Sequence, residues 1–110
     1  MRKFIVLTIA IAAIAFPAAA SASGTKVTVT ATEFHFKLSK ASVHAGKVTF
    51  VLVNKGHIGH DFKIDGKKTK VIGAGKSATL VVTLKKGTYK YECTVPGHAA
   101  AGMKGKLLVK

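Results

Sequence analysis

Apolar residues recur along most of this chain with a period of two, which is the period of a β-strand that buries one face. Glycine or asparagine lies at nearly every boundary between the alternating runs. Runs of this kind, rich in β-branched residues, occupy 26–30, 34–38, 47–53, 61–64, 68–72, 78–84, 88–93 and 104–109. The pattern predicts about eight short strands and no helix, and therefore an antiparallel sandwich or a small barrel.

The length and the residue inventory exclude several classes of protein. A chain of 110 residues holds one domain, or one domain with an appendage, and its 48% hydrophobic content suffices for a packed core. Asp and Glu together number only 4, so the chain has few carboxylates from which a catalytic acid–base pair could be built. The single cysteine, Cys93, excludes an intrachain disulfide, a four-thiolate zinc site and a Cys-x-x-Cys redox pair.

Residues 1–22 have the layout of a secretory signal peptide. Two cationic residues precede the apolar run 4–16, Pro17 breaks that run, and 20–22 reads Ala-Ser-Ala, a small-residue cleavage site. The run is shorter than the ~20 residues that a membrane-spanning helix needs. We therefore expect cleavage after residue 22, export to the periplasm or another extracytoplasmic compartment, and a functional domain over 23–110. An uncleaved anchor is the alternative.

The residues that carry chemistry cluster in one loop. After signal removal the chain has one Cys, one Met and one Pro, and all three lie within 93–103. The order is Cys-x4-His-x4-Met, formed by Cys93, His98 and Met103. A thiolate, an imidazole and a thioether are soft ligands that suit copper in both oxidation states. A trigonal copper site of this kind needs a second imidazole from elsewhere in the chain.

Four histidines are candidates for that second imidazole. His35 lies in the middle of a predicted strand, where a surface position is expected, and His44 lies in a predicted turn. His57 and His60 share a glycine-rich turn, and His60 lies where this turn meets the strand predicted over 61–64. A ligand at a strand end is held more rigidly than one in the middle of a loop, so His60 is favoured over His57.

Two segments of the sequence resemble the metal-binding segments of a known family. Residues 93–98, Cys-Thr-Val-Pro-Gly-His, followed by Met-Lys-Gly at 103–105, are similar to the copper loop of azurins. The four-residue gap before Met103 is closer to the loops of plastocyanin and rusticyanin. Ile-Gly-His-Asp at 58–61 is similar to the segment that holds the first histidine in azurins. The chain thus resembles the cupredoxins, small blue-copper proteins that carry one electron at a time.

The resemblance implies a Greek-key antiparallel β-sandwich of about seven or eight strands. It implies one copper ion, cycling between Cu(I) and Cu(II), with four ligands: His60, Cys93, His98 and Met103. The thiolate would form the short bond and the thioether the long axial contact. Gly59 matches a glycine whose carbonyl approaches copper weakly in azurins, and the resemblance leaves open whether it does so in this chain. A side-chain bridge from Asp61 to Thr94 would join the two ligand segments.

Three departures from the azurin pattern bear on this expectation. Asp61 stands where azurins usually have asparagine, which alters the hydrogen bonds around the ligands and so the reduction potential. The azurin disulfide is absent, and the 32 residues between His60 and Cys93 leave no room for the helical insertion of azurins. The compact plan of plastocyanin is therefore the better guide.

The expected function is a one-electron shuttle rather than an enzyme, because four ligands leave no coordination position for a substrate. We expect a monomer that docks on redox proteins such as a c-type cytochrome, an oxidase or a reductase. Loss of Arg2 and Lys3 lowers the formal charge from +14 to +12, which favours a partner that is acidic at its docking face. The small, uncharged residues 99–102 would let that partner approach His98 closely.

Several alternatives share these features. A copper carrier or chaperone that delivers copper to a cuproenzyme would use the same ligands. A metal-free catalyst built on Cys93 and His98 would lack an evident orienting group. The charge also suits weak association with an anionic membrane surface, or a cationic surface-binding domain without a redox role. Nucleic acid is not an expected partner, because no recognition helix or aromatic-interleaved basic motif accompanies the lysines and the chain carries an export signal.

Overall fold

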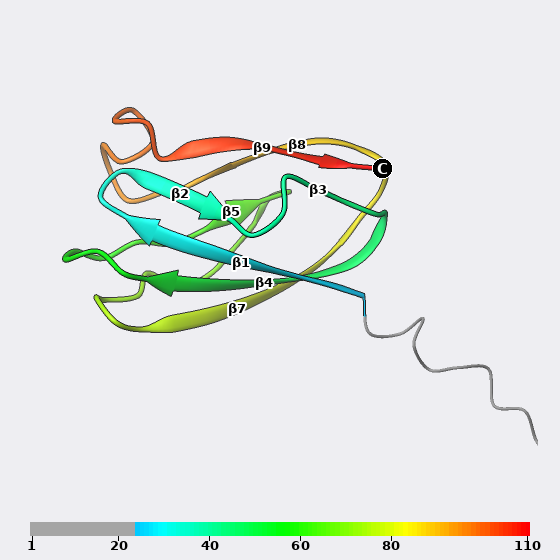
Figure 1. Ribbon diagram of the computed structural model, residues 1–110. Coiled ribbons are helices and arrows are strands. Elements are labelled where there is room, and N and C mark those ends of the chain that lie inside the picture. Colours follow the sequence, from blue (N-terminus) through cyan, green and yellow to red (C-terminus); the bar gives the residue numbers. More distant parts are fainter. Residues whose placement is uncertain (1–23) are drawn as a thin grey trace, which may run out of the picture.

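The computed structural model describes residues 24–110, and this part of the chain folds into nine β-strands without a helix (Figure 1). The strands are β1 (Thr25–Thr32), β2 (His35–Leu38), β3 (Ser42–Val43), β4 (Gly46–Asn54), β5 (Lys63–Ile64), β6 (Lys67–Lys68), β7 (Ser77–Leu84), β8 (Gly87–Glu92) and β9 (Lys104–Val109). In the described part, no helix is of the length and apolarity that crossing a membrane requires. The expected signal peptide, residues 1–22, lies outside the described residues.

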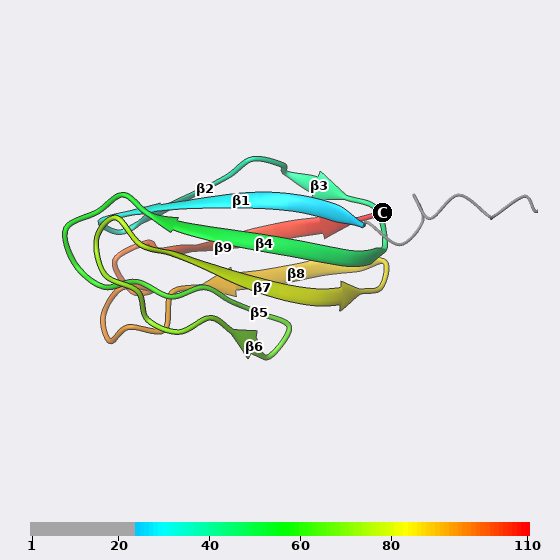
Figure 2. The same cartoon turned by 90° about the horizontal axis from the view of Figure 1, so that it is seen from below.

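The strands form two sheets that bury a common core. One sheet has the order β2-β1-β4-β7 and the other the order β3-β9-β8-β5-β6 (Figures 1 and 2). Alternate residues of the long strands face inward, and those of β1 and β9 that are buried include Val27, Val29, Leu107 and Val109. Each such side chain contributes about 1.5–3 kcal/mol when it leaves water. The prediction of an all-β sandwich is therefore confirmed.

The strand directions differ from the antiparallel prediction. Five pairings are antiparallel, but β1 pairs with β4 and β3 pairs with β9 in parallel. The chain leaves the first sheet after β2, adds β3 to the second sheet, and returns as β4 in the direction of β1. Period-two alternation records which face of a strand is buried and not the direction of its neighbour, so it does not distinguish the two pairings.

Two strands are shorter than predicted and one is additional. The pair Ser42–Val43 forms β3, which is too short for alternation to reveal. β5 and β6 are only two residues long, where the alternation predicts strands over 61–64 and 68–72. The residue before the predicted 61–64 strand, His60, instead makes an isolated bridge with Ile72. This stretch leaves the ladder and bends toward the end of the sandwich.

Four connecting segments meet at the end of the sandwich that is remote from the C-terminus, namely β1–β2, β4–β5, β6–β7 and β8–β9 (Figure 1). The β4–β5 loop is anchored in the core by Phe62, which is fully buried. The ring centroid of Phe62 lies 5.5 Å from that of Phe36, 5.1 Å from that of Phe50 and 5.5 Å from that of Tyr91. Because a ring packed on three sides has little freedom, the residues just before Phe62 are held in a fixed position.

Candidate metal centre

Three side chains from two distant loops converge at this end of the core. His60 comes from the β4–β5 loop, and Cys93 and His98 come from the β8–β9 loop. Their donor atoms all lie within 4.8 Å of one another, and all three residues are buried. The sulfur of Cys93 is 3.5 Å from Nδ1 of His98 and 4.0 Å from Nδ1 of His60, and the two Nδ1 atoms are 3.2 Å apart.

This donor set fits a copper ion. A metal bonded in one plane to nitrogen at about 2.0 Å and to sulfur at about 2.3 Å holds its donors about 3.5–3.7 Å apart, close to the spacings found here. A thiolate with two imidazoles is the trigonal set typical of electron-transfer copper. Burial raises the pKa of the Cys93 thiol, so the metal must displace a proton when it binds the sulfur.

Met103 lies at the base of the same loop and is fully buried. Its N–H donates to the carbonyl of His98 at 3.1 Å, and its carbonyl accepts from the N–H of Cys93 at 3.1 Å. The turn between these residues is closed by Gly102, whose φ of 114° is one that L side chains rarely adopt. The backbone of Met103 is thus bonded directly to two of the three converging residues.

Asp61 joins the two loops. Its Oδ1 accepts from the N–H of Thr94 at 2.6 Å and its Oδ2 accepts from the Thr94 hydroxyl. The N–H of Asp61 points at the sulfur of Cys93, 3.5 Å away. The predicted bridge between Asp61 and Thr94 is confirmed. Asp61 directly follows His60 in the chain, and Thr94 directly follows Cys93.

Asn54, at the end of β4, fixes the loop that carries His60. Its amide Nδ2 donates to the carbonyls of Ile58 and Ile72, each at 2.8 Å. Its Oδ1 accepts from the N–H of Gly56 at 2.9 Å. Asn54 is fully buried, so these bonds are shielded from competition with water.

Glu33, on the β1–β2 turn, contacts the His60 loop in a way that the sequence does not reveal. Its Oε1 lies 3.1 Å from Nε2 of His60 and accepts from the N–H groups of His57 (2.8 Å) and Ile58 (3.1 Å). Hydrogen bonds lower the pKa of Glu33 to about 2. The N–H of His57 contributes most, and the N–H of Ile58 and the His60 ring contribute less. A carboxylate facing Nε2 keeps the ring proton there, which leaves Nδ1 of His60 free to bind metal.

The other histidines do not join the cluster. The side chains of His35, His44 and His57 are exposed, and only the backbone N–H of His57 contributes, through Glu33. His98 is 6% exposed, and the ring of Phe34 packs edge-on against it at a centroid distance of 5.1 Å. At Gly59, a Cβ would come within 2.9 Å of the Val71 side chain, so the loop is closely packed there.

Comparisons with known proteins agree with this geometry. A family described as the cupredoxin-like domain matches residues 4–109. Rusticyanin from Acidithiobacillus ferrooxidans is 40% identical over a match that covers 57% of this chain and 53% of that protein. Auracyanin-B from Chloroflexus aurantiacus is 50% identical over 37% of this chain and 18% of that protein. The chain thus spans about half the length of the rusticyanin it matches.

A comparison with solved structures also indicates a cupredoxin fold. The structure of dithionite-reduced auracyanin from Roseiflexus castenholzii superposes with a TM-score of 0.67 at 24% identity. The match covers 80% of this chain and 98% of that one. Together with the family match over nearly the whole length, the sandwich and its buried Cys-His-His cluster show that this chain belongs to the cupredoxin-like family.

Proposed function

We propose that the protein is an exported type 1 copper protein that carries one electron between redox partners, with His60, Cys93, His98 and Met103 as its copper ligands. The observation that carries this proposal is the convergence of one sulfur and two Nδ1 atoms within 4.8 Å in a buried site. When bound, copper supplies a centre that alternates between Cu(I) and Cu(II). The chain supplies the donor atoms and the contacts that hold them in position.

The chain's contribution is to hold the donors still. Cu(I) and Cu(II) favour different geometries, so a site that resists rearrangement suits an electron carrier. Asp61 ties the two loops together through Thr94, and Asn54 and Glu33 fix the His60 loop from two further directions. Such partners around the ligands set their orientation and basicity.

Burial of the donors favours electron transfer over catalysis. His60 is 0% exposed, Cys93 1% and His98 6%, so a substrate has no route to the sulfur or to either Nδ1. An electron needs no such route, only a close approach of the partner to the edge of the site. Next to His98 the chain offers the small residues Ala99, Ala100 and Ala101, which let a partner come near.

We expect docking on a c-type cytochrome, an oxidase or a reductase, and delivery outside the cytoplasm by residues 1–22, with the working domain over 23–110. A formal charge of +12, which remains after the loss of Arg2 and Lys3, favours partners that present carboxylates.

Titration with Cu(II) tests the proposal. The protein should take up one equivalent and turn intensely blue, because charge transfer from the thiolate absorbs visible light. The Cys93→Ser variant should lose the colour, whereas His57→Ala, which alters an exposed histidine outside the cluster, should keep it. Blue colour in the serine variant, or none in the wild type, would overturn the assignment. Reversible voltammetry without metal loss supports the electron carrier, and release of copper on reduction supports the copper carrier.

A further inference from the structure

The outer face of the second sheet carries a patch of lysines that the metal centre does not use. The register places Lys104 opposite Glu92 and Glu92 opposite Lys63, which in turn lies opposite Lys68. Two residues along the strands, and so on the same face, Lys90 lies opposite Lys106. Residues directly opposite each other on paired strands project from the same face. We call this surface the lysine face, and its members are Lys63, Lys68, Lys90, Lys104 and Lys106.

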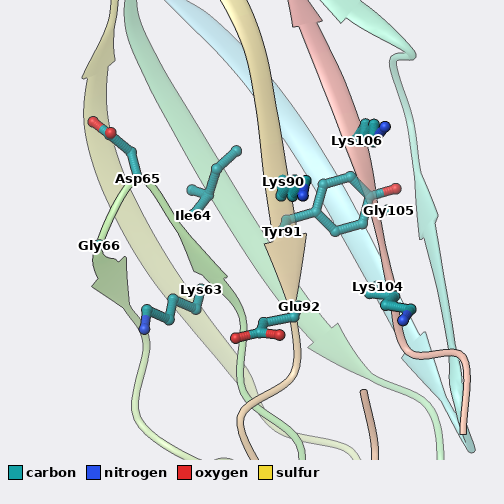
Figure 3. A pocket seen from close by; sticks show the side chains of 10 residues that line it. All are labelled: Lys63, Ile64, Asp65, Gly66, Lys90, Tyr91, Glu92, Lys104, Gly105 and Lys106. Carbon is teal, nitrogen blue, oxygen red and sulfur yellow. The ribbon is translucent and has the colours of Figure 1, made fainter. Parts of the chain in front are cut away.

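A groove of about 600 Å³ runs across this face, over strands β5, β8 and β9 (Figure 3). Four of the lysines line it, and the carboxylates that line it are those of Asp65 and Glu92. Figure 3 shows the four ammonium-bearing side chains placed on three neighbouring strands. The groove therefore has an excess of positive charge.

The lysines of this face lack partners within the described residues. In residues 24–110 the only carboxylate found within 4.0 Å of a basic side chain is that of Glu33, which faces His60, so no lysine there has a carboxylate within 4.0 Å. Lys90 opposite Lys106 and Lys63 opposite Lys68 are like-charge pairs, which destabilise a sheet. An anionic ligand laid across the face would relieve this repulsion.

We infer that the lysine face is a docking surface for an acidic protein segment in extended conformation. Lys104 and Lys106 are two residues apart on one strand, so their side chains lie about 7 Å apart on the same face. An extended segment with a carboxylate at every second residue repeats at the same interval. Lys90 and Lys63 on the adjoining strands then contact the same segment from the side.

A lipid surface suits the face less well than a protein segment does. Proteins that bind bilayers insert aromatic and large apolar side chains between the headgroups. The lysine face has one large exposed apolar neighbour, Leu108, and Tyr91 beneath the groove is half-buried against Phe62. A concave groove also favours a chain over a flat bilayer.

The position of the face connects it with the metal centre. β8 ends at Glu92, and the next residue is Cys93. A partner seated in the groove would lie beside the strand that leads into the proposed copper ligand. That consequence rests on the proposed function, but the docking itself does not, because it depends only on the lysines.

Fluorescence anisotropy with a labelled peptide of alternating Glu and Thr tests the inference, with vesicles of phosphatidylglycerol and phosphatidylcholine as the second probe. The face variant Lys90→Glu/Lys106→Glu should bind the peptide at least about tenfold more weakly at low salt. The control Lys26→Glu/Lys37→Glu changes the net charge equally but lies on the first sheet, and should lose less than about twofold. Glu92→Gln removes a carboxylate from the groove and should strengthen binding, a gain that misfolding does not produce.

Three results would overturn the inference: equal losses in the face and control variants, no gain with Glu92→Gln, or binding of the vesicles in preference to the peptide. Measuring the protein both with and without copper separates this test from that of the metal site. Peptide binding by a protein that never turns blue would support the docking surface and reject the electron carrier.

Discussion

Replacing Asn54 by alanine tests whether the His60 loop is held by one buried amide. The amide makes three hydrogen bonds, two from Nδ2 to the carbonyls of Ile58 and Ile72 at 2.8 Å and one to Oδ1 from Gly56 at 2.9 Å. A buried hydrogen bond contributes about 1 kcal/mol, so their loss should lower the free energy of unfolding by about 3 kcal/mol. This loss is a large part of the total free energy of unfolding, which is roughly 5–15 kcal/mol for a natural protein domain.

The assay is urea unfolding of the copper-free protein, followed by copper titration of the same variant. Asn54 bonds the carbonyl of Ile72, whose backbone also pairs with that of His60, so its loss should loosen His60 and lower copper affinity by about tenfold. Thr79→Ala, at an exposed position within β7, serves as the matched control. A loss of stability below about 0.5 kcal/mol with unchanged copper affinity would refute the reasoning.

Three further predictions address the thiol, a carboxylate and a tight packing contact. The Cys93→Ser variant should remain folded by circular dichroism yet lose the visible absorption of the copper-loaded protein; an unfolded variant would contradict this. Hydrogen bonds lower the pKa of Glu33 from 4.5 to about 2, so its stabilising effect is complete above pH 4.5 and is lost as the pH falls through about 2. A carboxyl NMR titration of Glu33 should therefore have its midpoint near 2, and a midpoint near 4.5 would reject the contacts. The Gly105→Ala variant places a Cβ in steric conflict with the Tyr91 hydroxyl, and calorimetry should show a loss in the free energy of unfolding of about 1–3 kcal/mol. An unchanged melting temperature would disprove the packing.

The strands and the loop that holds Cys93, His98 and Met103 could be predicted because their signals are local in sequence. Alternation along 47–53 and 78–84 reflects the burial of one face, and β4 and β7 occupy those ranges. The spacing of Cys93, His98 and Met103 fits one loop, and the prediction of His60 relied on a strand expected directly after it. β5 begins only at Lys63, so His60 is held by its bridge to Ile72 and not by a strand end. The structure brings His60 to within 4.8 Å of the Cys93 sulfur and of His98.

The remaining features depend on contacts between segments far apart in the chain. Glu33 meets the His60 loop across 27 positions, and Asn54 reaches Ile72 across 18, so no spacing rule identifies either residue. The parallel pairing of β1 with β4 follows from the path of the chain between the sheets rather than from the pattern of either strand. The expected signal peptide, 1–22, lies outside the described residues and stays a prediction.

X-ray absorption at the copper edge tests the proposed ligand set most directly. The copper-loaded protein should show one short bond to sulfur and two bonds to imidazole nitrogen, from Cys93, His60 and His98, and should lose the sulfur bond in Cys93→Ser. A first coordination sphere made only of nitrogen and oxygen would contradict the assignment, because copper would then lie elsewhere than among the three side chains that the fold brings together.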